Sequence, residues 1–391
     1  MRFLRTGWTV WIVYAALLSV VVFRTVGAHT ITVYRDAADA WLAHAPLYDL
    51  RSIHGFLYLP QAALLFVPLA KLPLATGEVV WRLLSLGFLA YAVHALVLHL
   101  RREGVGKPGF ALLSFLLLPS TFASARNGQT NLALGAALLL TGLALIDRRW
   151  TAATLLLLLM LALKPIAAAP LLLVGAVHPA TRWRLLAGLA LFALLPFLFS
   201  LSDPGYVIDQ YRLMAAKLAI AGSPDEHGFA DLGGLLWTFL GHPVSQNALH
   251  LVSVGAGLGT LLLALHARKI DPRHAPLWLA ALGGAYLMLF NPRTEENSYV
   301  LLAAVMLPFA ADALAGAKRK VEAAFLVSTL LLLGCDSYGD WIRPWSHLWL
   351  KAFLALAFWG YLTGRMGGKK GLFKREAATA CAIAQSTQKG N

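Results

Sequence analysis

The sequence predicts an all-α protein that crosses a membrane many times. Hydrophobic residues make up 59% of the 391 residues and charged residues only 13%, whereas an ordinary soluble domain has about 25% charged residues. The mean hydropathy is +0.66, and apolar runs with short polar connections recur along the whole chain. This composition excludes a water-soluble globular enzyme.

Twelve apolar runs are the predicted spanning helices. The first follows Arg2 and Arg5 and is long enough to be an uncleaved anchor. Since several later runs are short, we expect about 10–12 spans, in one integral membrane domain over residues 1–364. The runs are 7–26, 78–100, 110–123, 132–146, 151–163, 166–177, 185–201, 249–266, 275–290, 299–315, 323–334 and 348–364.

The basic residues indicate the orientation. With twelve spans, 21 of the 33 Lys and Arg residues fall on the side that holds both termini. Cytoplasmic loops carry such an excess, so we expect a multi-pass protein of the plasma or inner membrane with both termini in the cytoplasm. This bias explains the net charge of +14 without a nucleic-acid partner. The two cysteines, Cys335 and Cys381, predict neither a disulfide framework nor a metal motif.

Two stretches allow alternative interpretations. Residues 151–177 form either one kinked 27-residue helix or a hairpin that turns at Lys164-Pro165. The hairpin is favoured because a single helix would move every later basic cluster outside. Residues 55–73 contain three prolines, which indicate a re-entrant or interfacial segment; a kinked span there would also reverse the orientation.

Two long outer loops, 27–77 and 202–250, are where function is expected, because irregular backbone on one face of a membrane protein usually lines a cavity. The first contains VYRDAADAWLAHAPLYD (33–49), which predicts a short interfacial helix. The tail 365–391 is basic and then small and polar, which predicts a disordered cytoplasmic extension that binds the membrane surface.

Polar residues cluster in two short turns of the predicted outer side. In ARNGQTNLAL, Arg126, Asn127, Gln129 and Asn131 crowd the end of the third span. Polar side chains at membrane depth mark functional sites, although helix capping is the alternative for the two asparagines. In LALKP, Lys164 either extends to the interface or meets an anion inside a cavity.

Other charged residues have plainer interpretations. The turns 291–299 and 335–345 are either polar loop tips or parts of the site. Glu78 and Arg82 are spaced to form a structural pair on one helix. Three histidines near inner helix ends are interpreted as interface residues rather than ligands: His94, His99 and His266.

The first loop, the proline-cut segment, GQTN and LALKP occur together in an order that resembles glycosyltransferase family 87, over roughly Val33 to Leu173. The resemblance implies a GT-C fold with an outward-facing site and short interfacial helices. It also implies transfer of mannose, or another hexose or pentose, from a polyprenyl phosphate to a lipid or cell-envelope glycan. No cofactor is implied, and no carboxylate cluster that would hold a metal is evident.

Family members carry their presumed catalytic Asp shortly before a Val-Tyr pair, which Val33 and Tyr34 match here. The matching position in this chain is Thr30. The nearest carboxylates, Asp36 and Asp39, are three residues apart and share a helix face. We choose Asp36 as the base because it lies closest; an alignment gap would favour Asp39, and a solvated helix face is the non-functional alternative.

The chemistry that the resemblance implies explains the other candidates. A base takes the proton of the attacking hydroxyl, which is worth about 10²–10⁴ in rate, and cations balance the charge that grows on the leaving phosphate. Arg126, Lys164 and Arg293 are the candidate cations, and aromatic rings either stack on sugars or anchor at the interface. The full substrate-binding set is Tyr34, Arg35, Tyr48, Arg126, Asn127, Gln129, Asn131, Lys164 and Arg293.

Two rival functions stay open. A transporter or flippase of lipid-linked sugars would place charges near the bilayer midplane and openings on both faces, whereas here the polar residues gather at one face. A catalytically inactive family member is suggested by Thr30.

Overall fold

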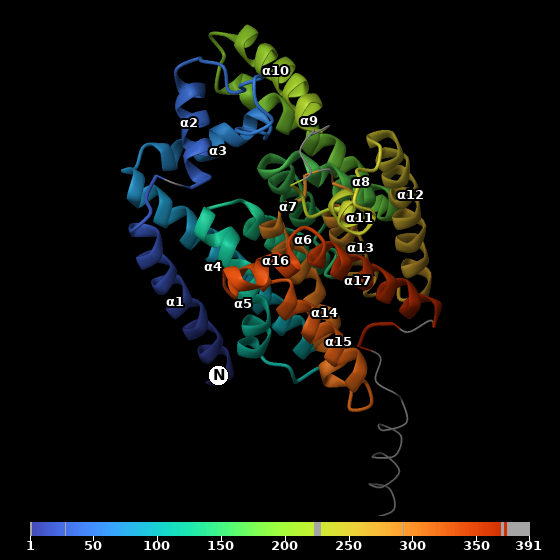
Figure 1. Ribbon diagram of the computed structural model, residues 1–391. Coiled ribbons are helices and arrows are strands. Elements are labelled where there is room, and N and C mark those ends of the chain that lie inside the picture. Colours follow the sequence, from blue (N-terminus) through green and yellow to red (C-terminus); the bar gives the residue numbers. More distant parts are fainter. Residues whose placement is uncertain (1, 28, 223–227, 292, 369–370, 374–391) are drawn as a thin grey trace, which may run out of the picture.

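The computed structural model describes all residues except 1, 28, 223–227, 292, 369–370 and 374–391, and the described part is helical without β-strands (Figure 1). Most of the predicted tail therefore lies outside the described residues, and α17 extends to Gly367. The helices are α1 (Arg2–Phe23), α2 (Ile31–Leu42), α3 (Pro60–Ala70), α4 (Leu74–Arg102), α5 (Phe110–Asn127), α6 (Asn131–Ile146), α7 (Trp150–Leu163), α8 (Ala168–Val177), α9 (Arg182–Leu198), α10 (Pro204–Gly222), α11 (Leu232–Leu240), α12 (Gln246–Ile270), α13 (Ala275–Phe290), α14 (Val300–Ala315), α15 (Lys320–Leu332), α16 (Arg343–Ser346) and α17 (Leu350–Gly367). Short 3-10 helices lie at Pro165–Ala167, Pro179–Thr181, Glu296–Tyr299, Cys335–Ser337 and Asp340–Ile342.

Each of the twelve predicted apolar runs coincides with one helix: α1, α4 to α9, α12 to α15 and α17. Five helical segments are long and apolar enough to cross a membrane, which confirms the polytopic all-α prediction. Others are shorter: the 14 residues of α7 cover about 21 Å at 1.5 Å per residue, less than the roughly 30 Å of hydrocarbon. The count of about 10–12 spans therefore stays a prediction.

The helices run back and forth between two ends of the bundle. The loop end carries α2, α3, α10 and α11, of which α2, α3 and α10 stand at the top of Figure 1. The opposite end carries the N-terminus and the connections 103–109, 147–149, 178–181, 271–274 and 316–319.

Helices α6, α13 and α14 form the centre of the bundle. The most apolar window of α14 is 89% buried, whereas the windows of α12 and α9 are only 11% and 17% buried. The peripheral helices expose large apolar side chains such as Leu186 and Leu251. Apolar surface of this extent is unfavourable in water, so it indicates the lipid-facing side of the bundle.

The central helices approach closely because α6 presents glycines to its neighbours. A Cβ atom at Gly135 would lie 3.2 Å from the Cα of Leu301 and 3.3 Å from the carbonyl oxygen of Val300. At Gly142 it would lie 3.3 Å from the carbonyl oxygen of Pro276. Small residues at such positions let membrane helices pack backbone to backbone.

The chain reverses at Lys164, as the hairpin interpretation predicts. The ring of Trp150, at the start of α7, lies 6.4 Å from the ring of His178, just after α8. One continuous helix over these residues would separate the two rings by about 40 Å at 1.5 Å per residue. The structure therefore excludes the kinked single helix.

The proline-cut segment forms no span. The 11-residue helix α3 would cover about 16 Å, too little for the hydrocarbon layer. It packs against α2, and the guanidinium of Arg35 in α2 donates to the carbonyls of Leu69, Ala70 and Leu72 at the end of α3. These bonds satisfy carbonyls that a helix end otherwise leaves unpaired.

We predict that Gly135→Leu destabilises the protein. The added side chain meets backbone atoms of α14 that cannot rotate away, and overpacking of this kind costs about 1–3 kcal/mol. The measurement is the thermal unfolding midpoint in detergent. Gly87→Leu is the matched control, because a Cβ atom there meets nothing within 4 Å and the residue is exposed. Equal losses in both variants would contradict the close packing of α6.

Candidate active site at the loop end

Two polar turns that are far apart in sequence meet at the loop end. The amide nitrogen of Gln129 donates to Glu295 Oε2 over 2.7 Å. The amide nitrogen of Asn131 donates to Gln129 Oε1 over 2.6 Å and to Asn297 Oδ1 over 3.1 Å. The turn between α5 and α6 is thereby joined to the turn between α13 and α14, and the carboxylate of Glu295 is fixed at their junction.

Lys164 lies next to this junction, at the C-terminal end of α7. It lies among many protein atoms, yet its side chain keeps intermediate exposure. Burial lowers the pKa of Lys164, the charge of Glu295 opposes this shift, and the charge of Arg293 adds to it. Among the described residues, its ammonium group makes no hydrogen bond, although the charge of Glu295 acts on it. A largely buried cation without a hydrogen-bonded partner is expected to meet an anion.

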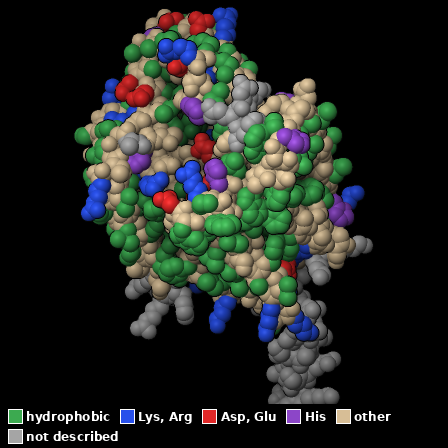
Figure 2. Space-filling model, in the orientation of Figure 1, with side chains coloured by type: hydrophobic (Ala, Val, Ile, Leu, Met, Phe, Trp, Pro, Cys, Tyr) green, Lys and Arg blue, Asp and Glu red, His purple; other side chains and the backbone are tan. Residues whose placement is uncertain are grey.

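The surface of this end is hollowed. Figure 2 shows acidic, basic and histidine side chains gathered around a hollow beneath the top layer, while apolar side chains cover most of the surface below. Arg293 helps to close the site: its guanidinium donates to the carbonyl of Ile53 and lies 5.2 Å from the ring of Phe229. The turn 291–299 is therefore tied to both long loops.

The predicted Glu78–Arg82 pair is confirmed, and it holds the start of α2 in place. Both side chains are buried, and Nη1 of Arg82 lies 3.3 Å from Glu78 Oε2. Glu78 also accepts hydrogen bonds from the backbone amide of Gly27 and forms one with His29. Arg82 donates to the carbonyls of residues 78, 125 and 126. The segment before α2 is thus anchored to α4.

Thr30 lies at the N-terminus of α2 beside the GQTN turn. Its backbone amide donates to the carbonyl of Asn127 over 3.1 Å. Gly128 follows with a φ of +67°, and a Cβ atom there would lie 3.2 Å from the guanidinium carbon of Arg82. Arg126 itself is exposed, and its carbonyl is what contacts Arg82.

Helix α2 directs its two aspartates away from the junction. The buried face is formed by Ile31, Tyr34, Ala37, Ala38 and Trp41, whereas Asp36 and Asp39 are exposed on the other side. Partial burial and the charge of Asp39 raise the pKa of Asp36, and Arg35 opposes this shift. Among the described residues, neither carboxylate makes a hydrogen bond with the junction. The role of Asp36 or Asp39 as base stays a prediction.

The two tyrosines of the candidate set are buried among aromatic residues. Tyr34 stacks on Phe66 at 4.6 Å, and its hydroxyl shares a 2.9 Å hydrogen bond with that of Tyr58. Burial raises the pKa of Tyr58 to about 12, and the charge of Glu295 adds to the shift, which places these hydroxyls near the junction. The Tyr48 hydroxyl donates to the carbonyl of Tyr58 over 2.7 Å.

Helix α11 covers the turn 291–299 from the second long loop. The Tyr299 hydroxyl donates to the carbonyl of Ala230, whose own amide donates to the carbonyl of Thr294. The carboxylate of Asp231 caps α11 by accepting from the amide of Gly234 over 3.0 Å. This cap is buried, so its carboxylate has little access to water.

Three residues of the site were assigned no binding or catalytic role from the sequence. Glu295 was recognised only as part of a polar turn, and its position beside Gln129 depends on contacts across 166 residues. Tyr58 stands in an apolar segment that gives no signal. Lys217 is fully buried, and its ammonium donates to three carbonyls of residues 49–54, which it holds against α10.

Comparison with known proteins supports the pattern of motifs. A family model described as glycosyltransferase family 87 matches residues 56–292, which is more than half of the chain. The match includes the proline-cut segment, GQTN and LALKP, and thereby confirms the resemblance. No curated protein matches the chain.

The buried cap of α11 predicts a dependence of stability on pH. Burial raises the pKa of Asp231 from 3.8 to about 6 against opposing backbone hydrogen bonds. The folded state then binds more protons than the unfolded state between these values, so stability falls as the pH rises through this window. The variant Asp231→Asn keeps the cap but cannot ionise. Its stability relative to wild type should increase from about pH 4 to about pH 6.5, by at most about 3 kcal/mol.

The measurement is thermal unfolding in detergent across this range. Asp209→Asn is the control, since that carboxylate is exposed on α10 and undergoes the same change of charge. A stability difference for Asp231→Asn that does not change with pH would contradict burial of the ionised carboxylate.

Proposed function

Since the chain belongs to glycosyltransferase family 87 and is a membrane glycosyltransferase, we propose that it transfers a hexose or pentose from a polyprenyl-phosphate carrier to a lipid or cell-envelope glycan acceptor at the outer face of the cell membrane. The observation that carries the proposal is Lys164, a partly exposed but strongly desolvated lysine on which the charge of Glu295 acts.

The proposed partner of Lys164 is the phosphate of the donor. An ammonium group held out of water binds a phosphate strongly, because the attraction is little screened by solvent. Its charge is useful in the reaction, since negative charge grows on the phosphate as the sugar leaves. Arg293, whose charge acts on Lys164, adds to this positive field.

An apolar groove supports a lipid-borne donor. It lies between α7 and α9 and is closed by α3, with Gln61, Leu158, Ala162, Leu191 and Phe192 among its lining residues. Leu191 is largely exposed, so the groove opens on the lipid-facing side. Ala162 stands near the C-terminal end of α7, which Lys164 follows. In the proposal, a prenyl chain occupies the groove and its phosphate extends beyond this end of α7 to the ammonium group.

We assign the base to Glu295 in place of Asp36. In the proposed step Glu295 takes the proton of the acceptor hydroxyl as that oxygen bonds to the anomeric carbon. The bond between this carbon and the phosphate oxygen breaks, and polyprenyl phosphate leaves with the electron pair. Glu295 is supported by its place beside Lys164, whereas Asp36 lies on the exposed face of α2. The resulting transfer inverts the anomeric centre.

The assignment predicts which variants lose activity. In proteoliposomes supplied with labelled polyprenyl-phosphate sugars and membrane lipids, Glu295→Gln should lower kcat by about 10²–10⁴, the usual contribution of a general base. Lys164→Met should raise KM for the donor and lower kcat, because it removes a phosphate contact. Lys71→Met, which removes an exposed lysine of the loop end, is the control and should stay within about twofold of wild type.

Asp36→Asn separates the two candidate bases. If this variant is inactive while Glu295→Gln keeps activity, the base is the carboxylate expected from the sequence and the assignment to Glu295 is wrong. Wild-type protein that binds donors and never transfers the sugar would instead indicate an inactive family member.

The outer-face location has its own prediction. In a variant lacking Cys335 and Cys381, a cysteine introduced by Arg126→Cys should react with a membrane-impermeant maleimide on intact cells. One introduced by Arg149→Cys should react only after permeabilisation. Both arginines are exposed, and they lie at the loop end and the opposite end, respectively. The reverse pattern would place the site in the cytoplasm and contradict the proposal.

A further inference from the structure

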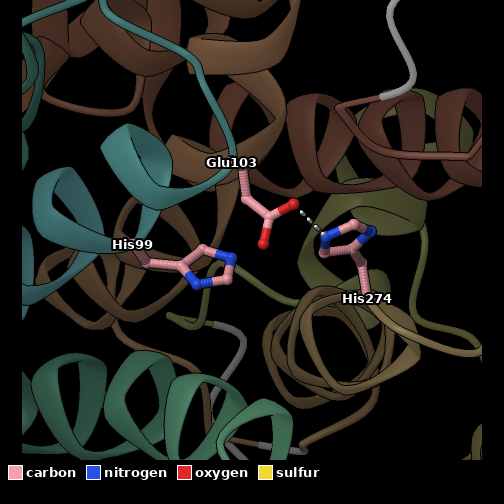
Figure 3. Close-up of side chains that lie close together, drawn as sticks. All are labelled: His99, Glu103 and His274. Carbon is pink, nitrogen blue, oxygen red and sulfur yellow. Dashed lines mark ion pairs between the residues drawn. The ribbon is translucent and has the colours of Figure 1, made fainter.

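A second cluster of reactive side chains lies at the opposite end of the bundle, away from the proposed active site. His99 belongs to the last turn of α4, Glu103 follows that helix, and His274 immediately precedes α13. Figure 3 shows both imidazole rings directed toward the carboxylate between them. One ligand atom from each of the three residues lies within 4.8 Å of the other two.

The two histidines are buried and incompletely paired. His99 is 6% exposed and His274 is 5% exposed. Nε2 of His99 and Nε2 of His274 are both buried without a hydrogen-bond partner. Buried polar atoms are almost always satisfied, so two unpaired nitrogen atoms beside one carboxylate require an explanation.

The second carboxylate of the cluster fixes the orientation of His274. Its Nδ1 lies 3.1 Å from Asp271 Oδ1. Asp271 Oδ2 accepts from the indole nitrogen of Trp278 and from the backbone amide of Leu372. With a proton on Nδ1, Nε2 presents a lone pair to Glu103 Oε2 at 3.5 Å. Two electron-rich atoms at this distance are stable only with a proton or a cation between them.

We propose that His99, Glu103 and His274 bind a divalent transition-metal ion of the Zn²⁺ type. Two imidazole nitrogens and a carboxylate are a ligand set that zinc prefers. Two ligands of a tetrahedral zinc, each about 2.0–2.1 Å from the ion, lie about 3.3–3.4 Å apart, close to the separation of His274 and Glu103. Metal-bound histidines usually donate their other nitrogen to a carboxylate, as His274 does to Asp271.

The ion would join two segments, because His99 and Glu103 lie at the end of α4 and His274 lies in the connection before α13. The ring of Phe373, beyond α17, packs 5.1 Å from the ring of His274. The guanidinium of Arg273 donates a 2.6 Å hydrogen bond to Glu103 Oε1, which orients the carboxylate. The position of the cluster assigns the metal a structural role, separate from sugar transfer.

The test measures metal directly. The full-length protein, with its purification tag removed, is stripped with a chelator in detergent, dialysed against Zn²⁺ or Co²⁺ and analysed for bound metal. We expect about one ion per chain, a visible Co²⁺ spectrum with nitrogen and oxygen ligation, and a higher unfolding midpoint with Zn²⁺. His99→Gln and His274→Gln should lose the stoichiometric ion, and Asp271→Asn should weaken binding about 10–100-fold.

His178→Gln is the matched control. His178 also lies at the opposite end and has a buried unpaired Nε2, but the charge that acts on it is that of Arg268. This variant should bind metal as the wild type does. The proposal fails if wild-type protein binds no stoichiometric ion, or if neither Zn²⁺ nor the chelator changes its unfolding midpoint. That outcome would indicate that His274 pairs only with the carboxylates of Asp271 and Glu103.

Discussion

Hydrocarbon offers no hydrogen-bond partner, so this chain has to satisfy its charges and its free backbone groups within itself. The sides of the bundle follow this constraint, since the peripheral helices α9 and α12 expose mainly leucine, valine and other apolar residues. Polar groups collect at the two ends, where water or other protein groups can reach them. The side chains of Gln129, Asn131, Asn297 and Glu295 satisfy one another in a single network. Lys164 differs from these residues, because it is strongly desolvated and yet makes no hydrogen bond among the described residues.

The other cations of the loop end make this contrast meaningful. Arg35, Arg82 and Lys217 each donate to three backbone carbonyls, and each thereby fixes an irregular segment against a helix. Charge-assisted bonds of this kind are stronger than neutral ones, which suits loops that have little apolar surface to bury. These three cations therefore have a structural role. Lys164 makes no such hydrogen bond among the described residues, which leaves its ammonium group available to a ligand.

The sequence predicted the positions of the helices and turns far better than the contacts of individual side chains. Hydropathy and prolines were enough for the twelve helices and the non-spanning helix α3, because these depend on local pattern. The reversal at Lys164 needed the distribution of basic residues along the whole chain as well. The pairing of Glu78 with Arg82 was also local, at one turn of α4. The partner of Gln129 is 166 residues away, and no local pattern encodes such a contact. Nearness in sequence to the family position favoured Asp36 as the base; this residue lies on the exposed face of α2, and its role as the base stays a prediction.

The missing family carboxylate at Thr30 can be understood from the same geometry. The amide of Thr30 bonds to the carbonyl of Asn127, and Gln129 in the same turn bonds to Glu295. The start of α2 and the carboxylate of Glu295 therefore both contact the turn between α5 and α6. In the proposed function, the base comes from the turn before α14 and therefore does not require an acidic side chain at position 30.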